Sequence, residues 1–336
     1  MSDPVTVEVT RGTMVESVHR GAAIVVDADG AVAFSIGDVL RPIYPRSAIK
    51  ALQALPLVES GAADRYGLTP AELALACSSH SGEPGHVATA ASMLAKAGRD
   101  VATLECGSHW PNLTTGVAQA LARTGAEPTA LHNNCSGKHS GFVCLACATG
   151  NDPSGYVGRG HAVQRYVAEA VGEVTGAPIG ETTDCGTDGC SIPTYGFSLT
   201  AMATAFARFG TGIGLEPVRA AAAKRLRAAC AAEPFMVAGT GRFCTDVMAL
   251  FGERVFVKTG AEGVFCATFP DQGFGIALKC LDGASRASEV MMAALIARFV
   301  PMTEAQAAAF ARYRSPIMKN WNGIETGTVR PAGALA

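Results

Sequence analysis

A serine and a lysine stand three residues apart in the segment PRSAIK, where Ser47 precedes Lys50. If a helix begins near Ser47, both side chains lie on one face with Cβ atoms about 5–6 Å apart, so the hydroxyl can meet the amine. The positive end of the helix dipole and burial in a cleft both disfavour an ammonium group, which makes Lys50 a candidate base and Ser47 a candidate nucleophile. The same spacing also fits a serine that caps a helix, followed by a surface lysine.

A second candidate motif is Lys258-Thr259-Gly260, at the end of the strand-like run RVFV. In penicillin-recognising enzymes and β-lactamases, a S-x-x-K motif is followed far downstream by K-T-G. Both motifs occur here in that order, the first at a predicted helix start and the second on a predicted strand. Lys258 alone would also fit an exposed hairpin residue, but the two motifs together favour a serine hydrolase.

The polar run ACSSHSGE, residues 76–83, follows a predicted helix and contains Ser79, His80 and Glu83. Enzymes with the two motifs above carry a polar serine element between them, usually S-x-N, and Ser79 is the candidate for that element. The chain departs from this pattern, because Ser79 is followed by His80 and a second serine. The alternative is a polar loop in which Ser79 caps the next helix and Glu83 supports the cap.

Two glycine-flanked cysteines, Cys135 in HNNCSGKHSG and Cys190 in TDCGTDGCSIP, predict a site for a cation such as Zn²⁺ if their loops converge. A third ligand would come from Lys138, His139 or Cys185. Ligand chemistry favours His139 over Lys138, because a lysine binds a metal only after it loses its proton. Buried structural thiols beside tight glycine turns are the alternative.

The composition limits the classes of partner. Hydrophobic residues make up 49% of the 336 residues and charged residues 17%, which is enough apolar material for a large core. The net charge is -2 and no segment carries a cluster of Lys and Arg, so nucleic acid is not an expected partner. The start MSDPVTVEVTRG lacks the pattern of a secretory signal, and the apolar stretch 290–300 is interrupted by Arg298. We therefore expect a cytoplasmic protein without a membrane segment, whose eleven cysteines are free thiols or metal ligands.

Strand-like and helical patterns follow one another in blocks. Residues 5–38 alternate in the manner of strands, residues 46–209 carry mostly apolar spacings of three and four, and strand-like alternation returns after a helix at 217–232. We expect an α+β fold with one antiparallel sheet from both chain ends, flanked by helices, and a mostly helical insertion. The chain would be a single catalytic unit, 1–336, with residues 1–45 and 233–336 in the sheet portion and 46–232 in the helical portion.

Six segments together resemble the Rhizobium etli-type L-asparaginases, the third structural class of asparaginases: YPRSAIKALQ, ACSSHSGE, HNNCSGKHSG, TDGCSIPTY, VKTGAEGVF and SPIMKNWNG. They occur in collinear order, and the resemblance covers essentially the whole chain. It implies a homodimer with a fold similar to those of serine β-lactamases and glutaminases. It also implies hydrolysis of L-asparagine to L-aspartate and ammonia.

The resemblance further implies residue roles. The catalytic residues would be two serine and lysine pairs, Ser47 with Lys50 and Ser79 with Lys258. The family pattern selects the lysine over the histidine for the zinc site, whose ligands would be Cys135, Lys138 and Cys190. Four other polar residues are candidates for binding substrate or supporting the zinc: Arg46, His80, Glu83 and Asp188. We expect Ser47 to attack the side-chain amide after a lysine removes its proton, directly or through the second pair, and zinc to act in substrate binding more than in chemistry.

Three other functions remain open from the sequence. A glutaminase would act on a substrate one methylene longer, which shifts binding by only about 1–3 kcal/mol in an apolar pocket. A β-lactamase or penicillin-binding enzyme is disfavoured, because such enzymes work outside the cytoplasm and the chain start lacks the pattern of an export signal. A zinc-dependent binding protein on the same scaffold would have no reason to retain both serines and both lysines.

Overall fold

The computed structural model describes residues 3–336, which form two compact units. The first unit contains the residues up to Ala48 together with Phe197–Thr211 and Val257–Ala336, and the second contains Ile49–Gly196 and Gly212–Phe256. This division differs from the sequence-based portions in three places. Residues 46–48 and 197–211 belong with the sheet, and residues 233–256 belong with the helices.

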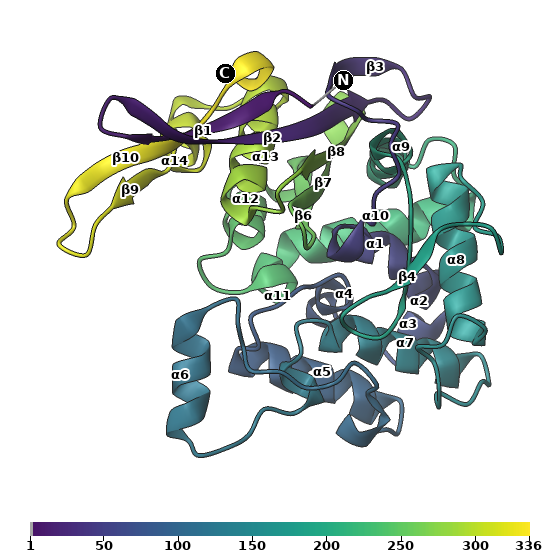
Figure 1. The fold of residues 1–336 in the computed structure, drawn as a ribbon. Helices are drawn as coiled ribbons and strands as arrows, with labels where there is room; N and C mark the ends of the chain where they lie inside the picture. The colour runs from purple at the N-terminus through teal and green to yellow at the C-terminus, as the bar shows by residue number, and fades with distance from the viewer. Residues whose placement is uncertain (1–2) are drawn as a thin grey trace. The chain divides into compact units, whose positions relative to one another are not determined.

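The first unit is built on an antiparallel sheet whose strands come from both ends of the chain (Figure 1). Its order is β6-β7-β8-β2-β1-β10-β9, with β3 also paired to β2. The N-terminal strand β1 is hydrogen-bonded to the C-terminal strand β10, so the expected sheet from distant segments is confirmed. The strands are β1 (Val5–Arg11), β2 (Met14–Val26), β3 (Val32–Ile36), β6 (Phe256–Thr259), β7 (Val264–Phe269), β8 (Phe274–Cys280), β9 (Ile317–Lys319) and β10 (Glu325–Pro331).

Three long helices belong to the first unit: α9 (Leu199–Thr211), α13 (Ser285–Phe299) and α14 (Glu304–Arg314). Helix α9 packs directly on β8 because Gly275 has no side chain, and a Cβ there would lie 1.9 Å from the Ala203 carbonyl oxygen. Helix α13 packs on the same sheet, where Met291 Sδ lies 3.5 Å from Thr6 Oγ1. The close approach of α9 to β8 explains why this helix belongs with the sheet, although its neighbours in sequence are helical.

The second unit is mainly helical, and α7 (Ser136–Ala148) lies at its centre, with every residue from 136 to 146 buried. Gly137 allows α7 to approach α4, because a Cβ at this position would lie 2.3 Å from the Leu75 carbonyl oxygen. A hairpin of β4 (Cys185–Thr187) and β5 (Pro193–Tyr195), which the sequence did not indicate, carries the loop around Cys190. The other helices are α1 (Lys50–Gln53), α2 (Leu55–Glu59), α3 (Ala62–Arg65), α4 (Pro70–Ala76), α5 (Pro84–Lys96), α6 (Thr115–Arg123), α8 (Ala162–Thr175), α10 (Pro217–Ala232), α11 (Pro234–Ala238) and α12 (Phe243–Phe251).

Within residues 3–336, none of the helices combines the length and the apolar character that spanning a bilayer would require.

Candidate active site

A buried lysine lies at the centre of the polar cluster in the second unit. Lys50 is the first residue of α1 and follows the 3₁₀ helix Arg46–Ile49, and only 1% of its surface is exposed. Its Nζ lies 2.9 Å from Ser79 Oγ, 2.6 Å from the Ser78 carbonyl oxygen and 3.0 Å from Cys135 Sγ. A buried amine needs such partners, because moving a charged group out of water is costly. Lys50 therefore connects a serine hydroxyl to a cysteine sulfur.

The loop that carries Ser79 is held by backbone hydrogen bonds on both sides. The Ser79 N–H donates to the Val237 carbonyl oxygen of α11 (3.0 Å), and the His80 N–H donates to the Asn134 carbonyl oxygen before α7 (3.2 Å). These contacts fix the position of the buried Ser79 hydroxyl beside the Lys50 amine. The sequence motifs indicated both Lys50 and Ser79 as site residues. They did not predict this contact, because they paired Lys50 with Ser47 and Ser79 with Lys258.

Two cysteines from separate segments meet beside this lysine. Cys135 is the N-cap residue of α7, and Cys190 lies in the loop between β4 and β5. Lys138 Nζ lies 3.1 Å from Cys190 Sγ, and Lys50 Nζ lies 3.0 Å from Cys135 Sγ. Asp188 Oδ1 accepts hydrogen bonds from the N–H (3.3 Å) and the thiol (3.4 Å) of Cys190. The residues expected to bind zinc thus converge in one buried cluster.

Neighbouring charges set the protonation of this cluster. The hydrogen bond from Cys190 lowers the pKa of Cys135 well below that of an ordinary thiol, with help from Lys50 and Lys138 and against the effect of burial. The same hydrogen bond, together with burial, raises the pKa of Cys190. Burial alone would lower the pKa of Lys138, but the negative charges of Cys190 and Cys135 raise it. Cys135 therefore has the lower pKa of the two thiols.

His80 uses both ring nitrogens within the fold. Its Nδ1 accepts a hydrogen bond from the Gly82 N–H (3.0 Å), so its Nε2 carries the proton and donates to Ser136 Oγ (2.8 Å). Burial and the neighbouring His86 lower the pKa of His80 well below its usual value, so the ring is neutral. These contacts orient the loop between α4 and α5 and leave neither ring nitrogen free to bind a carboxylate.

Glu83 also makes contacts within the fold. It is the N-cap residue of α5, and its two carboxylate oxygens accept hydrogen bonds from the N–H (2.8 Å) and the hydroxyl (2.7 Å) of Thr240. The alternative in which Ser79 caps this helix is wrong, because Glu83 occupies the cap position itself.

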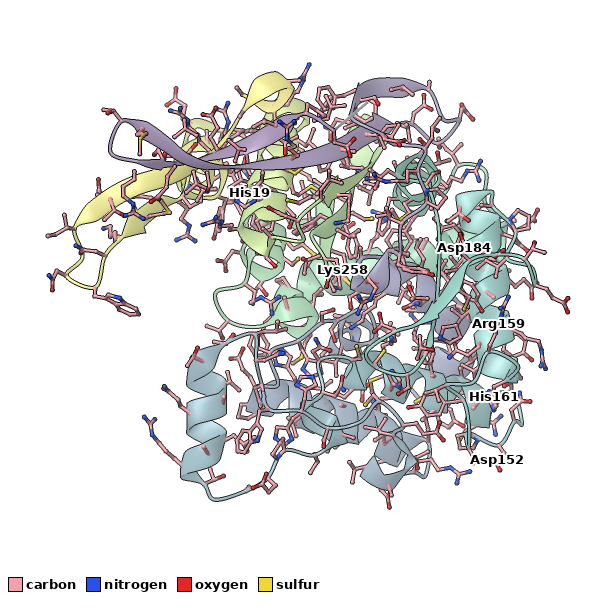
Figure 2. The ribbon with its side chains drawn as sticks, in the orientation of Figure 1. His19, Asp152, Arg159, His161, Asp184 and Lys258 are labelled. Atoms are coloured by element: carbon pink, nitrogen blue, oxygen red, sulfur yellow. The ribbon has the colours of Figure 1, made fainter. Side chains whose placement is uncertain are left out.

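In the first unit, the K-T-G motif packs against the turn that carries Ser47. A Cβ at Gly260 would lie 2.8 Å from the Pro45 carbonyl oxygen, so only glycine fits at this position. Lys258 lies on β6, where it is buried and its Nζ donates to the Thr259 carbonyl oxygen (2.8 Å; Figure 2). Ser47 is half-buried in the same unit. It is therefore a neighbour of the K-T-G motif, as the order of the two motifs in the sequence suggested.

Arg46, directly before Ser47, has a left-handed backbone conformation with a φ of 52°. Such a conformation is uncommon for a residue other than glycine and persists where the surrounding structure imposes it. The Ala48 N–H donates to the Pro45 carbonyl oxygen (3.1 Å) and closes the turn around Arg46 and Ser47. This hydrogen bond constrains the backbone that carries Ser47.

His19, Cys280 and Asp282 form a second group of potential metal ligands, in the first unit. Their ligand atoms all lie within 4.8 Å of one another, and within residues 3–336 no other set of three or more His, Cys, Asp or Glu side chains meets this condition. Arg286 Nε donates to His19 Nε2 (3.1 Å), so Nδ1 carries the ring proton and donates to Asp282 Oδ2 (2.5 Å). A metal at Nδ1 would displace this proton and face the guanidinium charge. We therefore interpret the group as a hydrogen-bonded anchor of β2, where Figure 2 labels His19.

Other polar residues labelled in Figure 2 bind backbone groups around α8. His161 is the N-cap of α8, accepting from the Val163 N–H (3.2 Å) and donating to the Asp152 carbonyl oxygen (2.8 Å). Arg159 donates to the Gly180 carbonyl oxygen (2.7 Å). These contacts hold the loops around α8.

Two residues around the thiol pair were not singled out from the sequence. Asn134 Oδ1 lies 3.2 Å from Cys135 Sγ, and the Tyr156 hydroxyl lies 2.6 Å from His139 Nδ1 while it accepts the Glu105 N–H (2.9 Å). His139, which ligand chemistry favoured, is thus held by a tyrosine through Nδ1. Neither role had a sequence signal, because an asparagine beside a cysteine and an isolated tyrosine are common in loops.

Comparison with known protein families gives one match. The family model described as L-asparaginase II matches residues 7–331. No curated protein sequence matches the chain significantly. Among solved structures, a β-lactamase from Mycobacterium bovis is 15% identical over 86% of this chain and 94% of its own, with a TM-score of 0.41. A protein named Mglu is 14% identical over 80% of this chain and 64% of its own, with a TM-score of 0.35.

Proposed function

The chain belongs to the L-asparaginase II family, and from this premise we propose that it hydrolyses the side-chain amide of L-asparagine to L-aspartate and ammonia with a serine nucleophile and a lysine base. The observation that carries the chemical part is the buried contact between Lys50 Nζ and Ser79 Oγ, 2.9 Å apart. An amine and a hydroxyl at this distance can exchange a proton directly, as general acid and base catalysis requires.

Lys50 is the proposed base. All of its close partners accept hydrogen bonds, so the protonated amine is well supported, and the neutral amine can take the proton of a serine hydroxyl. The Cys135 thiolate beside it gives the proton a further acceptor at 3.0 Å. Lys50 can therefore gain and lose a proton during turnover without leaving its position.

Ser47 is the proposed nucleophile, which loses its proton to a lysine either directly or through the second serine and lysine pair. The Ser47 hydroxyl oxygen would attack the amide carbon of asparagine as its proton passes to the base, and ammonia would leave with a proton returned from the same base. Water would then hydrolyse the aspartyl ester on Ser47 and release aspartate. The constrained turn at Arg46 and the packing of Gly260 support this choice, because both constrain the backbone that carries Ser47.

The nucleophile can be tested by trapping the acyl intermediate. Rapid quenching during turnover, followed by peptide mapping, should show an aspartyl adduct on Ser47, and Ser47→Ala should eliminate it. An aspartyl adduct on Ser79 in the unmodified enzyme would instead make Ser79 the nucleophile and overturn the assignment.

The substrate can be tested by ammonia release. We expect turnover of L-asparagine, weaker turnover of L-glutamine and no hydrolysis of a β-lactam. One methylene changes binding by about 1–3 kcal/mol, which corresponds to roughly a 10- to 200-fold preference. A preference for glutamine would make the enzyme a glutaminase, and no ammonia from either amide would contradict the proposed function.

The buried cluster fits a zinc ion, which we propose as a bound cofactor. Two sulfur donors and one amine converge there, and zinc takes sulfur and nitrogen donors. Cys135, Lys138 and Cys190 would hold the ion, and Asp188 would orient Cys190 through its hydrogen bonds. When bound, zinc would supply a positive charge that attracts polar groups of the substrate.

The zinc proposal requires metal content and kinetics to be measured together. Cys135→Ala and Cys190→Ala should each lose zinc, whereas Cys147→Ala, at the far end of α7, should retain it. Chelation should raise KM more than it lowers kcat, because the metal serves binding. Stoichiometric zinc in both ligand variants would move the site elsewhere, and loss of all turnover in folded, metal-free enzyme would make the metal catalytic.

A further inference from the structure

The end of α11 and the turn that follows it, residues 237–242, are bound along the loop that carries Ser79. The Ser79 N–H donates to the Val237 carbonyl oxygen (3.0 Å), and Ser81 Oγ donates to the Ala238 carbonyl oxygen (2.9 Å). Bonds at alternate residues of the loop align the two segments with each other. The turn therefore starts from a fixed position beside the loop of the candidate active site.

Gly239 and Thr240 extend this alignment. A Cβ at Gly239 would lie 2.6 Å from Glu83 Oε1 and 2.7 Å from Ser81 Oγ, and its φ of 112° is one that favours glycine. The Thr240 N–H and hydroxyl donate to the two carboxylate oxygens of Glu83. The Arg242 N–H then closes the turn on the Gly239 carbonyl oxygen (3.4 Å). The chain thus reaches Arg242 through a turn that has little freedom.

The guanidinium group of Arg242 is partly buried and has no carboxylate partner in the chain. Its Nη1 donates to Ser81 Oγ at 3.5 Å, which is long for a hydrogen bond. Within residues 3–336, no aspartate or glutamate forms an ion pair with Arg242. Glu83 belongs to the neighbouring loop, but both of its oxygens bind Thr240 instead.

This position is unfavourable for an unpaired cation. Arg242 is the N-cap residue of α12, where the positive end of the helix dipole disfavours a guanidinium, and its side chain makes no capping hydrogen bond. Burial lowers the pKa of the nearby His86, and the Arg242 charge acts in the same direction, so this ring is neutral and supplies no negative charge. A partly buried charge without a counter-charge is costly. An anion from outside the chain would offset that cost.

We propose that Arg242 binds the α-carboxylate of the amino-acid substrate and thereby selects amino acids over amides that lack this group. The inference rests on the proposed function and names the residue that recognises the substrate. A guanidinium presents its donors as a planar fork, which matches a carboxylate. In asparagine, only a short aliphatic link separates the α-carboxylate from the amide. A substrate held at Arg242 therefore lies at the same loop that places the Ser79 hydroxyl beside Lys50 Nζ.

Arg46 was the arginine that the sequence indicated for substrate binding, and it lies in the first unit. Arg242 belongs to the second unit, together with Ser79 and Lys50. No motif marked it, because an arginine between a glycine turn and a helix is common in sequences. The two arginines can be distinguished by experiment.

The test compares L-asparagine with β-alaninamide, which has the same amide and an amine but no α-carboxylate. In the unmodified protein, kcat/KM for L-asparagine should exceed that for β-alaninamide by about 10- to 150-fold, the range of one hydrogen bond to a charged group. Arg242→Met should lower kcat/KM for L-asparagine by a similar factor and leave that for β-alaninamide unchanged. The loss should lie mainly in KM, because the carboxylate is bound alike before and during the reaction.

Two further variants serve as references. Arg242→Lys should keep part of the preference for L-asparagine, since lysine retains the charge but not the planar fork. Arg225→Met should leave both rates unchanged, because Arg225 on α10 forms a surface ion pair with Asp64 (2.7 Å). Circular dichroism should report a folded protein for each variant.

Three outcomes would overturn the inference. Equal losses for both substrates in Arg242→Met would make Arg242 a structural support of the Ser81 loop. Equal kcat/KM for the two substrates in the unmodified protein would show that the α-carboxylate is not recognised. Loss of the preference in Arg46→Met, with the preference intact in Arg242→Met, would assign the carboxylate to Arg46.

Binding measured without turnover separates the failure of the inference from the failure of the proposed function. Isothermal titration calorimetry should show that L-aspartate binds the unmodified protein more tightly than β-alanine, which lacks the α-carboxylate, and Arg242→Met should abolish this difference. The same result in a protein that releases no ammonia would uphold the inference and reject the proposed function. Ammonia release from L-asparagine, with the preference over β-alaninamide intact in Arg242→Met, would uphold the function and reject the inference.

Discussion

Lys50 is buried among a hydroxyl, a carbonyl oxygen and a sulfur, so its proton always lies within reach of an acceptor. Retaining such a group in a protein interior is costly unless each partner is present. A surface lysine needs no such partners, so the burial of Lys50 favours the catalytic interpretation of the S-x-x-K motif. The opposite interpretation, a helix cap followed by an exposed lysine, is wrong for Lys50.

Replacing this lysine should affect chemistry more than folding. We predict that Lys50→Met lowers kcat/KM for asparagine by about 10²- to 10⁴-fold, which is the usual contribution of a positioned base. Methionine fills a similar volume, so circular dichroism should remain unchanged. Lys96→Met is the control, because Lys96 is partly exposed and pairs with Glu72 away from the cluster (2.6 Å). Equal losses in the two variants would remove Lys50 from the mechanism.

Individual residues of the site were predictable from sequence, but their contacts were not. Ser79, Lys50 and Cys135 each stood out by motif, and only the fold shows that one amine contacts the other two. Motif spacing specifies neighbours within one helix turn, whereas these three residues come from α1, the loop after α4 and the N-cap of α7. Such convergence depends on helix packing, for which no local pattern exists.

At the scale of secondary structure elements, the end of strand β6 packs against the turn around Ser47. Gly260 packs against the Pro45 carbonyl oxygen, so the K-T-G motif limits where that turn can lie. Gly260 is therefore required in this chain for steric reasons. The role of the K-T-G motif is not limited to Lys258.

We predict that Gly260→Ala lowers kcat/KM by about 10²-fold, because the new Cβ must displace backbone beside Ser47 and small displacements of a catalytic group are that costly. Circular dichroism and thermal unfolding should report a folded protein. The matched control is Gly116→Ala in α6, where a Cβ meets no atom within 4 Å and alanine favours the helix. An unchanged rate in Gly260→Ala would show that the turn position does not matter for turnover.

The start of α13 depends on Asp282, which offers a test by pH. Burial alone would raise the pKa of Asp282, but hydrogen bonds from Cys280, the Ala284 N–H and His19 lower it to about 2 from 3.8. Because the folded pKa is depressed, the carboxylate stabilises the protein above about pH 4, and this contribution is lost as the pH falls toward 2.

We predict that Asp282→Asn is less stable than the unmodified protein at pH 6, by at most about 1 kcal/mol because the side chain is half exposed. The difference should shrink in urea unfolding at pH 3, since asparagine has no charge to lose. Asp29→Asn, at an exposed turn, should show neither effect. A pH-independent difference would contradict the anchor interpretation of His19, Cys280 and Asp282.

The elements were predictable where one local pattern decides them. The alternating strands at both ends of the chain predicted the antiparallel sheet, and the register of β1 with β10 confirms it. Helix α9 was assigned to the wrong portion, because helical periodicity identifies an apolar face but not the surface that covers it. The hairpin of β4 and β5 was missed because strands of three residues have too few positions to show alternation.

On the scale of the whole chain, the hairpin of β1 and β2 lies beside the hairpin of β9 and β10 in the first unit (Figure 1). Both hairpins carry exposed apolar side chains. Val15 lies opposite Thr10, whose hydroxyl contacts Thr328, and Thr328 lies opposite Ile317. Of this line across four strands, the two ends, Val15 and Ile317, are exposed apolar residues, and Thr10 is buried. Trp321, in the turn between β9 and β10, is fully exposed. Exposed apolar groups gathered in this way commonly mark an interface.

We propose that these hairpins contribute to a homodimer, in line with the expectation from the sequence. Sedimentation should give about twice 34.4 kDa. The double substitution Ile317→Lys with Trp321→Lys should weaken association. Each subunit would bury two unpaired charges in a symmetric contact, which destabilises the dimer. Val218→Lys is the control, since Val218 is exposed on α10 in the second unit. If the double variant remains a dimer at every concentration tested, the interface lies on another surface. If the unmodified protein is a monomer with full activity, the homodimer itself is rejected.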